Sequence, residues 1–400
     1  MGLIMGSNVG FIGLSQPVHV TLSLILALQE VMPHTHTRSF SIRLKSAFGM
    51  LLFSLTTLTS AQTTSAKVVE HTLANGLKIL VAEDKRAPTV AHMVWYKAGS
   101  IDEVNGKTGV AHVLEHMMFK GTKTIPTGEF SKRVAAMGGR ENAFTSKDYT
   151  GYFQQIPKER LAEVMALEAD RMSNLVLSKE EFEKEIKVVM EERRLRTEDQ
   201  ATSLVYEQLL ATAYTAHPYR APIVGWMNDL EAMTFEDARD WYNAWYTPSN
   251  AILIVAGDVD AQEVIRLAEL TYGKNISKPV PTRKPQIEPE QRGEKRGFVK
   301  APAENAYLVM GYKVPKLIDV EKDREAYALE ILSAVLDLDE NGRFTKNIVR
   351  GSRVANRAGA GYDMTSRGPS LFILDGTPAD RKSTSLNSSH STLSRMPSSA

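Results

Sequence analysis

The segment His112-Val113-Leu114-Glu115-His116 constrains this chain most, because it can place two imidazoles and a carboxylate on one side of a single helical turn. At about 100° per residue, His116 lies about 40° around the helix axis from His112, and Glu115 lies about 60° to the other side. Two neutral imidazoles at this spacing can share one zinc ion. The carboxylate then lies beside the metal, where it can take a proton from water. A catalytic zinc has three protein ligands and one open position, so a third ligand must come from elsewhere.

The order H-x-x-E-H reverses the commoner H-E-x-x-H and is the pattern of the inverzincin metalloproteases. Residues 179–198 are rich in Glu, Lys, Arg and Met and contain no Gly or Pro, which predicts a strong helix. In that helix Glu185 and Glu192 are seven residues apart and fall within about 20° of each other. This helix is therefore a candidate source of the third ligand.

The sequence closely resembles the pitrilysin/insulinase family of zinc metallopeptidases, in the short branch that includes mitochondrial processing peptidases and many bacterial proteases. That family combines H-x-x-E-H with a ligand Glu some 75 residues later, and Glu192 follows His116 by 192 − 116 = 76 residues. The resemblance runs from about residue 67 to about residue 380. Further segments that carry it are Phe119-Lys120-Gly121-Thr122, Gly138-Gly139, Asn142-Ala143-Phe144-Thr145-Ser146, His217-Pro218-Tyr219, Trp245-Tyr246-Thr247-Pro248-Ser249-Asn250-Ala251 and Gly257-Asp258.

The resemblance implies one Zn²⁺ per chain, bound by His112, His116 and Glu192, with Glu115 as the general base. Glu185 matches a supporting acidic residue one helical repeat before the ligand.

Glu191 is the competing ligand assignment, one residue from Glu192. Glu192 is preferred because it keeps both the family spacing and the shared stripe with Glu185. The resemblance also implies that Asn142, Ala143 and Phe144 form a substrate-facing edge strand.

The function that the resemblance implies is that of a zinc-dependent endopeptidase, which hydrolyses extended or unfolded peptides with a zinc-activated water. The partners expected are a peptide or unfolded protein substrate and a second chain, either a copy of this one or a metal-free homologue. An alternative is a non-catalytic, zinc-retaining subunit of a peptidase-like heterodimer. The intact motif argues against an inactive subunit that has lost these residues.

Composition narrows the function further. The formal net charge is +1 and the basic residues are mixed with acidic ones, which gives no sign of nucleic-acid binding. The chain contains no cysteine. Disulfides, thiolate metal sites and a cysteine nucleophile are therefore excluded, and any metal must be held by His and carboxylates.

The amino-terminal region has the order of a secretory signal peptide at about residues 32–61. Arg38, Arg43 and Lys45 precede the apolar run 47–58, and a small-residue cleavage site at residues 59–61 follows. The apolar run is too short to span a bilayer. We expect a start at Met32 with residues 1–31 as an over-extended start, a mature chain from Gln62, and a periplasmic or secreted protein. Membrane-surface binding through this segment is the alternative, which signal cleavage would remove.

The expected fold class is α+β, with two tandem homologous units that each pack a mostly antiparallel sheet with helices. We expect the second unit to be truncated. The expected divisions are an extended start and signal at 1–61, the metallopeptidase domain at 62–273, a proline-containing linker at 274–296, an incomplete second domain at 297–380 and a non-native Ser-rich tail at 381–400. Residues 67–98 predict three strands, with a hairpin turn at Asn75-Gly76 between the first two. Further strands are predicted at 141–146, 150–156, 251–259, 304–313, 353–363 and 370–377. Helices are predicted at 108–118, 127–137, 158–173, 179–197, 200–213, 234–245, 260–272 and 321–338.

Overall fold

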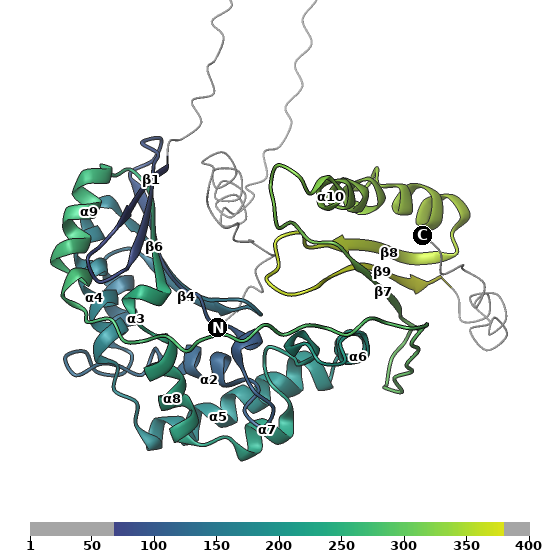
Figure 1. Cartoon of the computed structure of the whole chain (residues 1–400), viewed down its shortest axis with the longest axis horizontal. Coiled ribbons are helices and arrows are strands. Elements are labelled where there is room, and N and C mark those ends of the chain that lie inside the picture. The colour runs from purple at the N-terminus through teal and green to yellow at the C-terminus, as the bar shows by residue number, and fades with distance from the viewer. Residues whose placement is uncertain (1–67, 380–400) are drawn as a thin grey trace, which may run out of the picture.

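Two β-sheets organise the chain in this computed structural model, which describes residues 68–379 (Figure 1). The first is six-stranded in the order β1-β2-β6-β3-β5-β4, and the second is three-stranded in the order β7-β9-β8. Helices pack with both sheets, so the fold is α+β as predicted. The expected signal segment and the Ser-rich tail lie outside the described residues.

The strands and helices follow the predicted order. The strands are β1 (Val68–Thr72), β2 (Lys78–Glu83), β3 (Thr89–Tyr96), β4 (Arg140–Thr145), β5 (Thr150–Pro157), β6 (Ala251–Gly257), β7 (Leu308–Val314), β8 (Ala355–Tyr362) and β9 (Ser370–Pro378). The helices are α2 (Val110–Met117), α3 (Glu129–Ala136), α4 (Leu161–Asn174), α5 (Lys179–Arg193), α6 (Ala201–Ala213), α7 (Met227–Ala232), α8 (Phe235–Trp245), α9 (Ala261–Leu270) and α10 (Arg324–Asp337).

Three differences from the predicted elements have local causes. Helix α7 was not predicted, because six residues are too few to show a helical period. The π-helical turns η3 (Arg194–Glu198) and η7 (Thr345–Ser352) have no sequence signature that separates them from α-helix. Strand β7 begins four residues later than the predicted start at 304, since the residues before it pair with no strand.

The six-stranded sheet is antiparallel except where β2 runs parallel to β6. Its first hairpin turns at Asn75-Gly76, as the sequence predicted, and Gly76 has φ 84°, a left-handed conformation that glycine adopts without strain. Strand β4 is one edge of this sheet and pairs only with β5 among the described residues. That edge is where the expected substrate-facing residues lie.

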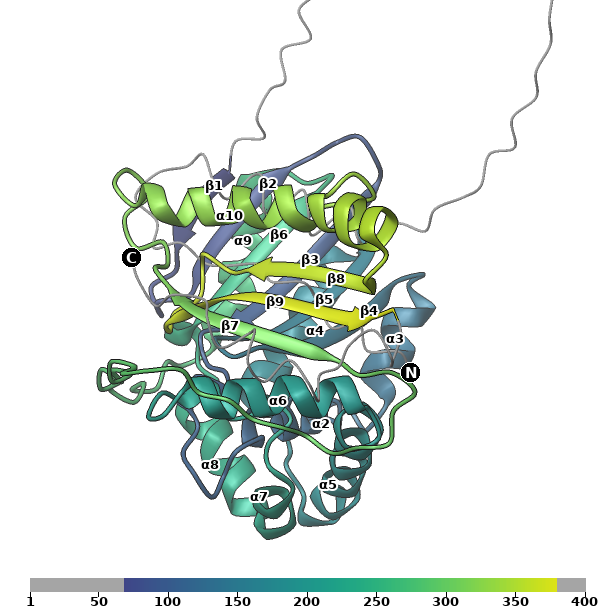
Figure 2. The ribbon, with the colours of Figure 1, turned by 90° about the vertical axis from the view of Figure 1, so that its right-hand side faces the viewer.

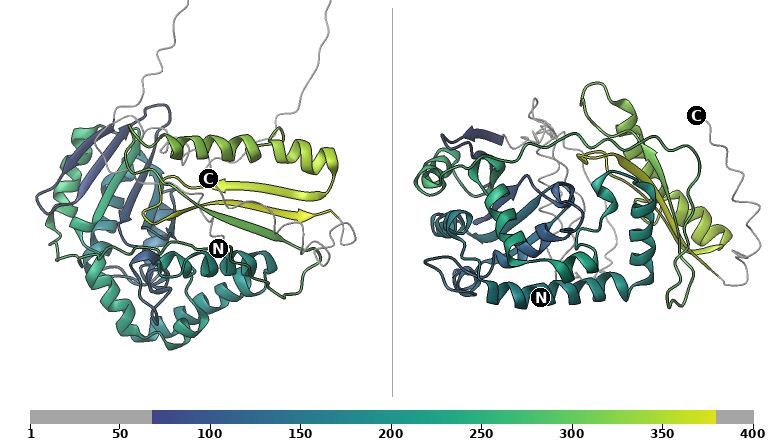
Figure 3. Two further views of the ribbon diagram at one scale, coloured as in Figure 1. Left: turned by 45° about the vertical axis from the view of Figure 1, so that its right-hand side comes forward. Right: turned by 60° about the horizontal axis from the view of Figure 1, so that its bottom comes forward.

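Alternation along the central strands separates the two faces of the six-stranded sheet. Val94 of β3 belongs to the main core, whereas its neighbour Trp95 belongs to a smaller cluster on the opposite face. Helices α4 and α9 lie on the main-core side (Figures 1 and 3). Side chains cap two of the helix starts: Ser178 accepts from the backbone N–H of Glu181 at α5, and Thr234 forms a capping box with Asp237 at α8.

The second sheet lies apart from the first (Figure 1), and α10 runs along it (Figure 2). Helix α6 of the first unit packs against it, because Leu210 and Ala213 join a small apolar cluster with Leu371 of β9. Polar contacts also connect the two units. The Arg367 guanidinium lies 3.2 Å from Asp102 Oδ2, and the Arg367 backbone N–H donates to Asp148. None of the helices within residues 68–379 is long and apolar enough to cross a membrane.

Glu288 lies in the irregular segment between the two sheets and binds this segment to the residues after α6 and to β7. Its carboxylate accepts hydrogen bonds from the backbone N–H groups of Thr215, Ala216 and His217, and it pairs with Lys313 of β7 at 3.1 Å. Burial alone would raise the pKa of Glu288, but these donors outweigh burial and lower its pKa to about 2. The ionised form is therefore favoured in the folded protein.

Replacing Glu288 with Gln should destabilise the protein at neutral pH by roughly 1.5–3 kcal/mol, the usual value of hydrogen bonds to a charged group. Because the folded pKa lies below the unfolded one, this stabilisation is present above about pH 4.5 and is lost as the pH falls toward 2. Denaturant titrations at several pH values measure it. The exposed Glu290→Gln is the matched control; an equal loss in both variants, or a loss independent of pH, would contradict the assignment.

Candidate metal centre

Two kinds of contact hold the first turn of helix α2 in place. Glu103 is buried, and its two carboxylate oxygens accept from the backbone N–H groups of Gly109 and Ala111, each at 2.9 Å. Gly109 has φ 89°, and a Cβ there would lie 2.5 Å from the Val224 carbonyl oxygen. Only glycine fits this close approach. The helix that carries both histidines is thus held at its first turn.

Helix α2 and helix α5 bring His112, His116 and Glu192 together. Each of the three offers one ligand atom, and these atoms lie within 4.8 Å of one another. Glu192 Oε2 is 3.8 Å from His112 Nε2 and 3.3 Å from His116 Nε2. This is the only such group of three among residues 68–379.

Glu191 lies elsewhere on α5. Its side chain is 58% exposed and pairs with Arg194 at 3.1 Å, whereas that of Glu192 is 11% exposed. Of the two competing candidates, the structure brings Glu192 to the histidines.

Glu185 lies one helical repeat before Glu192 and contacts the other nitrogen of His116, with 3.3 Å between Glu185 Oε2 and His116 Nδ1. Its Oε1 pairs with Lys120 Nζ at 2.5 Å. A carboxylate at the far nitrogen orients a metal-binding imidazole. The predicted supporting role of Glu185 thus has the geometry it requires.

The two imidazoles differ in their protonation. Burial, together with neighbouring His116, lowers the pKa of His112 to about 3, so His112 is neutral at pH 7. Burial also opposes the charged form of His116, but Glu185 and Glu192 outweigh it and raise the pKa of His116 to about 9.

Glu115 is almost fully buried, at 3% exposure, and its carboxylate faces the edge strand. Thr145, the last residue of β4, donates a 2.5 Å hydrogen bond to Glu115 Oε2. Burial raises the pKa of Glu115 to about 7, although Thr145 and His116 act in the opposite direction. A carboxyl group with a pKa near neutrality can both accept and return a proton at pH 7.

The expected substrate-facing residues lie on β4, and the Glu115 side chain of α2 contacts the last residue of that strand. Ala143 is buried, and Asn142 Oδ1 accepts from the Ala143 backbone N–H at 2.9 Å. The Phe144 ring packs against Gly151 of β5 and meets the Trp95 ring edge-on at a centroid distance of 5.1 Å. The Phe144 side chain is therefore engaged within its own sheet, which leaves the backbone of β4 as the part that can pair with a peptide.

The donor set fits a zinc ion. His116 Nε2 is buried and makes no hydrogen bond within residues 68–379, although it faces Glu192 Oε2. A buried nitrogen that makes no hydrogen bond and faces a carboxylate is suited to a cation held between the two groups. Two imidazoles and one carboxylate, with a further carboxylate behind one imidazole, are the ligands of a catalytic zinc site.

The contacts of three residues at this site were not predicted from the sequence, although two of the residues lie in segments that carry the family resemblance. Lys120 lies four residues after His116, and Arg196 lies four residues after Glu192, so helical spacing could have indicated both. Arg196 Nη1 pairs with Glu192 Oε1. Thr145 had no such signal, because its contact with Glu115 depends on how β4 packs beside α2.

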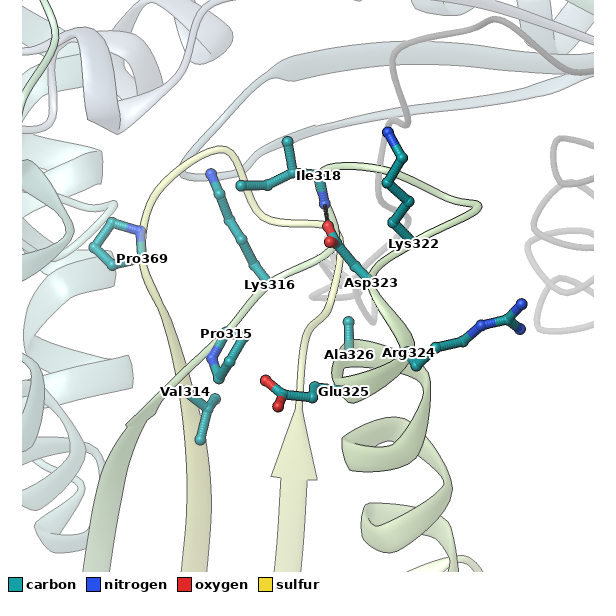
Figure 4. A pocket seen from close by; sticks show the side chains of 10 residues that line it. All are labelled: Val314, Pro315, Lys316, Ile318, Lys322, Asp323, Arg324, Glu325, Ala326 and Pro369. Atoms are coloured by element: carbon teal, nitrogen blue, oxygen red, sulfur yellow. Dashed lines mark hydrogen bonds between the residues drawn. The ribbon is translucent and has the colours of Figure 1, made fainter. Parts of the chain in front are cut away.

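A separate hollow of about 630 Å³ lies in the second unit, between the end of β7 and the start of α10 (Figure 4). It is lined by Lys316, Asp323, Arg324 and Glu325, among others. Asp323 is engaged by the backbone N–H groups of Ile318 and Asp319. This hollow contains no histidine, and its charges are mixed, so it offers no metal ligand set.

Comparisons with known proteins show which family the chain resembles. The sequence profile of the insulinase family (peptidase family M16) matches residues 78–225, and that of the peptidase M16 inactive domain matches residues 232–388. The chain is 35% identical over 350 residues to the zinc protease PqqE of Helicobacter pylori, which covers 85% of this chain and 77% of that protein. It is 32% identical over 213 residues to the probable mitochondrial-processing peptidase subunit beta of Schizosaccharomyces pombe, covering 53% of this chain and 46% of that one.

Solved structures show the same fold. The crystal structure of a protease from Helicobacter pylori has a TM-score of 0.74 at 34% identity and covers 78% of this chain and 75% of that chain. The periplasmic protease PqqL of Escherichia coli has a TM-score of 0.63 at 21% identity, with 78% of this chain and 35% of that chain covered.

Proposed function

The chain belongs to the insulinase family (peptidase family M16), and we propose that it is a zinc-dependent endopeptidase acting on extended or unfolded peptides. One observation carries the proposal: the ligand atoms of His112, His116 and Glu192 lie within 4.8 Å of one another, and Glu115 lies on the same turn of α2 as the histidines. Relatives that are named zinc proteases support the choice of metal.

A zinc ion held by these three side chains would lower the pKa of a water molecule toward neutrality and polarise the scissile carbonyl. Glu115 would take the water proton on its carboxylate and pass it to the leaving amine. Thr145 holds Oε2 of that carboxylate. The other oxygen, Oε1, is therefore the one available for the proton.

The substrate would bind as an added strand at the edge of β4 that makes no strand pairing within residues 68–379. Backbone groups of Asn142, Ala143 and Phe144 would pair with the peptide, which gives affinity with little dependence on sequence. Because β4 ends at Thr145, a peptide on this edge would run past the Glu115 carboxylate. This mode suits extended or unfolded chains and excludes segments that are already paired.

The proposal is tested by hydrolysis of an unstructured fluorogenic peptide before and after removal of metal with a chelator. We expect cleavage that is lost on chelation and restored by a stoichiometric amount of Zn²⁺. Zinc binding with no hydrolysis of any unstructured peptide would favour the alternative, a zinc-retaining subunit without turnover. Hydrolysis that survives complete metal removal would contradict the proposal.

A second chain is proposed as the working partner, either a copy of this chain or a metal-free homologue. A relative named as a peptidase subunit supports this. The edge of β4 supports it too, because within residues 68–379 this strand pairs only with β5, and an edge strand without a second partner binds chains unselectively. Light scattering combined with the peptide assay tests it. A monomer with full activity would refute the need for a partner.

Export is proposed on the basic, apolar and small-residue order of residues 38–61. The mature protein should begin near Gln62 and be found in the periplasm or outside the cell. Amino-terminal sequencing of the protein from its own cells decides this. An uncleaved chain in the cytoplasm would overturn it.

Replacing Glu185 with Gln should weaken zinc affinity about 10-fold while the site still loads with excess metal. Gln keeps the size of the side chain but loses the charge that pairs with Lys120 and favours the orientation of His116. Chelator competition measures the change. The matched control is Glu181→Gln on the same helix, which pairs with Lys184; equal affinities in the two variants would show that Glu185 does not support the site.

A further inference from the structure

The two oxygens of the Glu192 carboxylate face different partners. Oε2 faces Nε2 of both histidines, at 3.8 Å and 3.3 Å, while Oε1 pairs with Arg196 Nη1. From this juxtaposition we propose that Arg196 is a positioning residue for the metal centre: it holds Oε1 so that Glu192 presents Oε2 alone to the metal. The inference rests on the proposed zinc site.

This pair differs from ordinary ion pairs along α5 in its burial. Pairs at this spacing on an exposed helix contribute little, because water screens them and both side chains stay mobile. The Arg194–Glu191 pair is of that kind, with side chains 43% and 58% exposed. Glu192, in contrast, is 11% exposed. The ion pair between Glu192 and Arg196 is therefore screened less by water than the exposed pair is.

The backbone around Arg196 is also held in place. Arg196 lies in the π-helical turn η3, which directly continues α5, and such turns are frequent at functional sites. Arg193, just before this turn, is buried and pairs with Glu207 of α6 at 2.9 Å and with the Gly225 carbonyl at 3.0 Å. Arg196 thus projects from a turn that is anchored to a neighbouring helix.

Arg196 has two opposing effects on a metal cation. By fixing the carboxylate it favours binding, and by its positive charge it opposes binding. The charge is on a side chain that is 32% exposed, so solvent and salt screen its repulsion. The contact with Oε1 is direct. We therefore expect orientation to dominate, so that loss of Arg196 weakens metal binding about 10- to 100-fold, the range for residues that orient ligands.

The test compares the full chain with its Arg196→Met, Arg196→Lys and Arg194→Met variants. Zinc affinity is measured by chelator competition, and the coordination geometry is followed in the visible absorption spectrum of the Co²⁺-loaded proteins. Met keeps the length of the side chain and removes the charge and the donors. Arg194→Met removes the neighbouring exposed pair and is the matched control.

We expect Arg196→Met to lose about 10- to 100-fold in zinc affinity and to change the cobalt spectrum. Arg194→Met should match the parent protein in both, and Arg196→Lys should retain most of the affinity because Lys keeps a cation within reach of Oε1. If the Met variant fails to fold, Arg196→Ala, which also removes the charge and the donors, takes its place: weaker zinc binding with a changed cobalt spectrum supports the proposal, and an affinity equal to that of Arg194→Met overturns it.

Two outcomes would overturn the inference with the metal site intact: equal affinities in Arg196→Met and Arg194→Met, or weaker binding with an unchanged cobalt spectrum, which would indicate a general loss of stability. Failure of the parent protein to bind either metal would instead refute the proposed function itself. The parent's own binding thus separates the two failures.

Discussion

Replacing Glu115 with Gln should abolish peptide hydrolysis while the metal stays in place. The amide has nearly the same shape and can still accept the hydrogen bond from Thr145, but it cannot take a proton from water. General-base assistance contributes roughly 10²- to 10⁴-fold, so we expect a loss of that size in kcat/KM. Zinc content and the rate of hydrolysis are measured on the same preparation.

The control for this variant is Glu180→Gln, which makes the same chemical change at a carboxylate that is 80% exposed. It should leave both zinc content and rate unchanged. Full activity in Glu115→Gln would remove Glu115 from the chemistry. A loss of zinc together with activity would show that Glu115 supports the site rather than moves a proton.

Removing a ligand should have a different signature, in which metal and activity are lost together. We expect His112→Ala, His116→Ala and Glu192→Ala to bind zinc far more weakly than the parent, because two donors cannot hold a catalytic zinc ion. Glu191→Ala should bind zinc normally, since that side chain is exposed and pairs with Arg194. Metal analysis after gel filtration distinguishes these outcomes.

This pair of adjacent glutamates is a sharp test of the ligand assignment. If Glu191→Ala lost zinc and Glu192→Ala kept it, the assignment would be wrong by one residue and α5 would have to turn about its axis in the loaded protein. If both variants kept zinc, the third ligand would come from another part of the chain.

Much of the site could be predicted from the sequence because it depends on helical spacing. The four-residue step places His112 and His116 side by side, and the seven-residue step places Glu185 and Glu192 in one stripe. The structure brings both stripes together, with His116 between the two carboxylates. The resemblance to a known family supplied the pairing of the two helices, which spacing alone does not determine.

Contacts between different helices and strands could not be predicted from the sequence pattern. Thr145 reaches Glu115 only because β4 packs beside α2, and Glu103 supports α2 from a turn outside it. Arg193 and Arg196 lie in the predicted helix 179–198, whose pattern does not show that one is buried against α6 and that the other pairs with Glu192. Charged residues were thus the least predictable part, because their role depends on which face of the helix is covered.

For the fold, short apolar runs and turn residues sufficed to predict each strand within residues 68–379. The Asn75-Gly76 turn between two alternating runs predicted the hairpin of β1 and β2. Sheet order was not predictable in the same way. Strand β6 lies between β2 and β3 although it follows them by more than 150 residues, and such a long-range pairing leaves no local signal.

The most direct measurement is an anomalous difference map at the zinc absorption edge, from crystals of the full chain grown with Zn²⁺. We predict one strong peak per chain, bounded by Nε2 of His112, Nε2 of His116 and Oε2 of Glu192, with the Glu115 carboxylate beside it. A peak at any other group of side chains, or no peak at this site in a protein shown by metal analysis to contain zinc, would contradict the account.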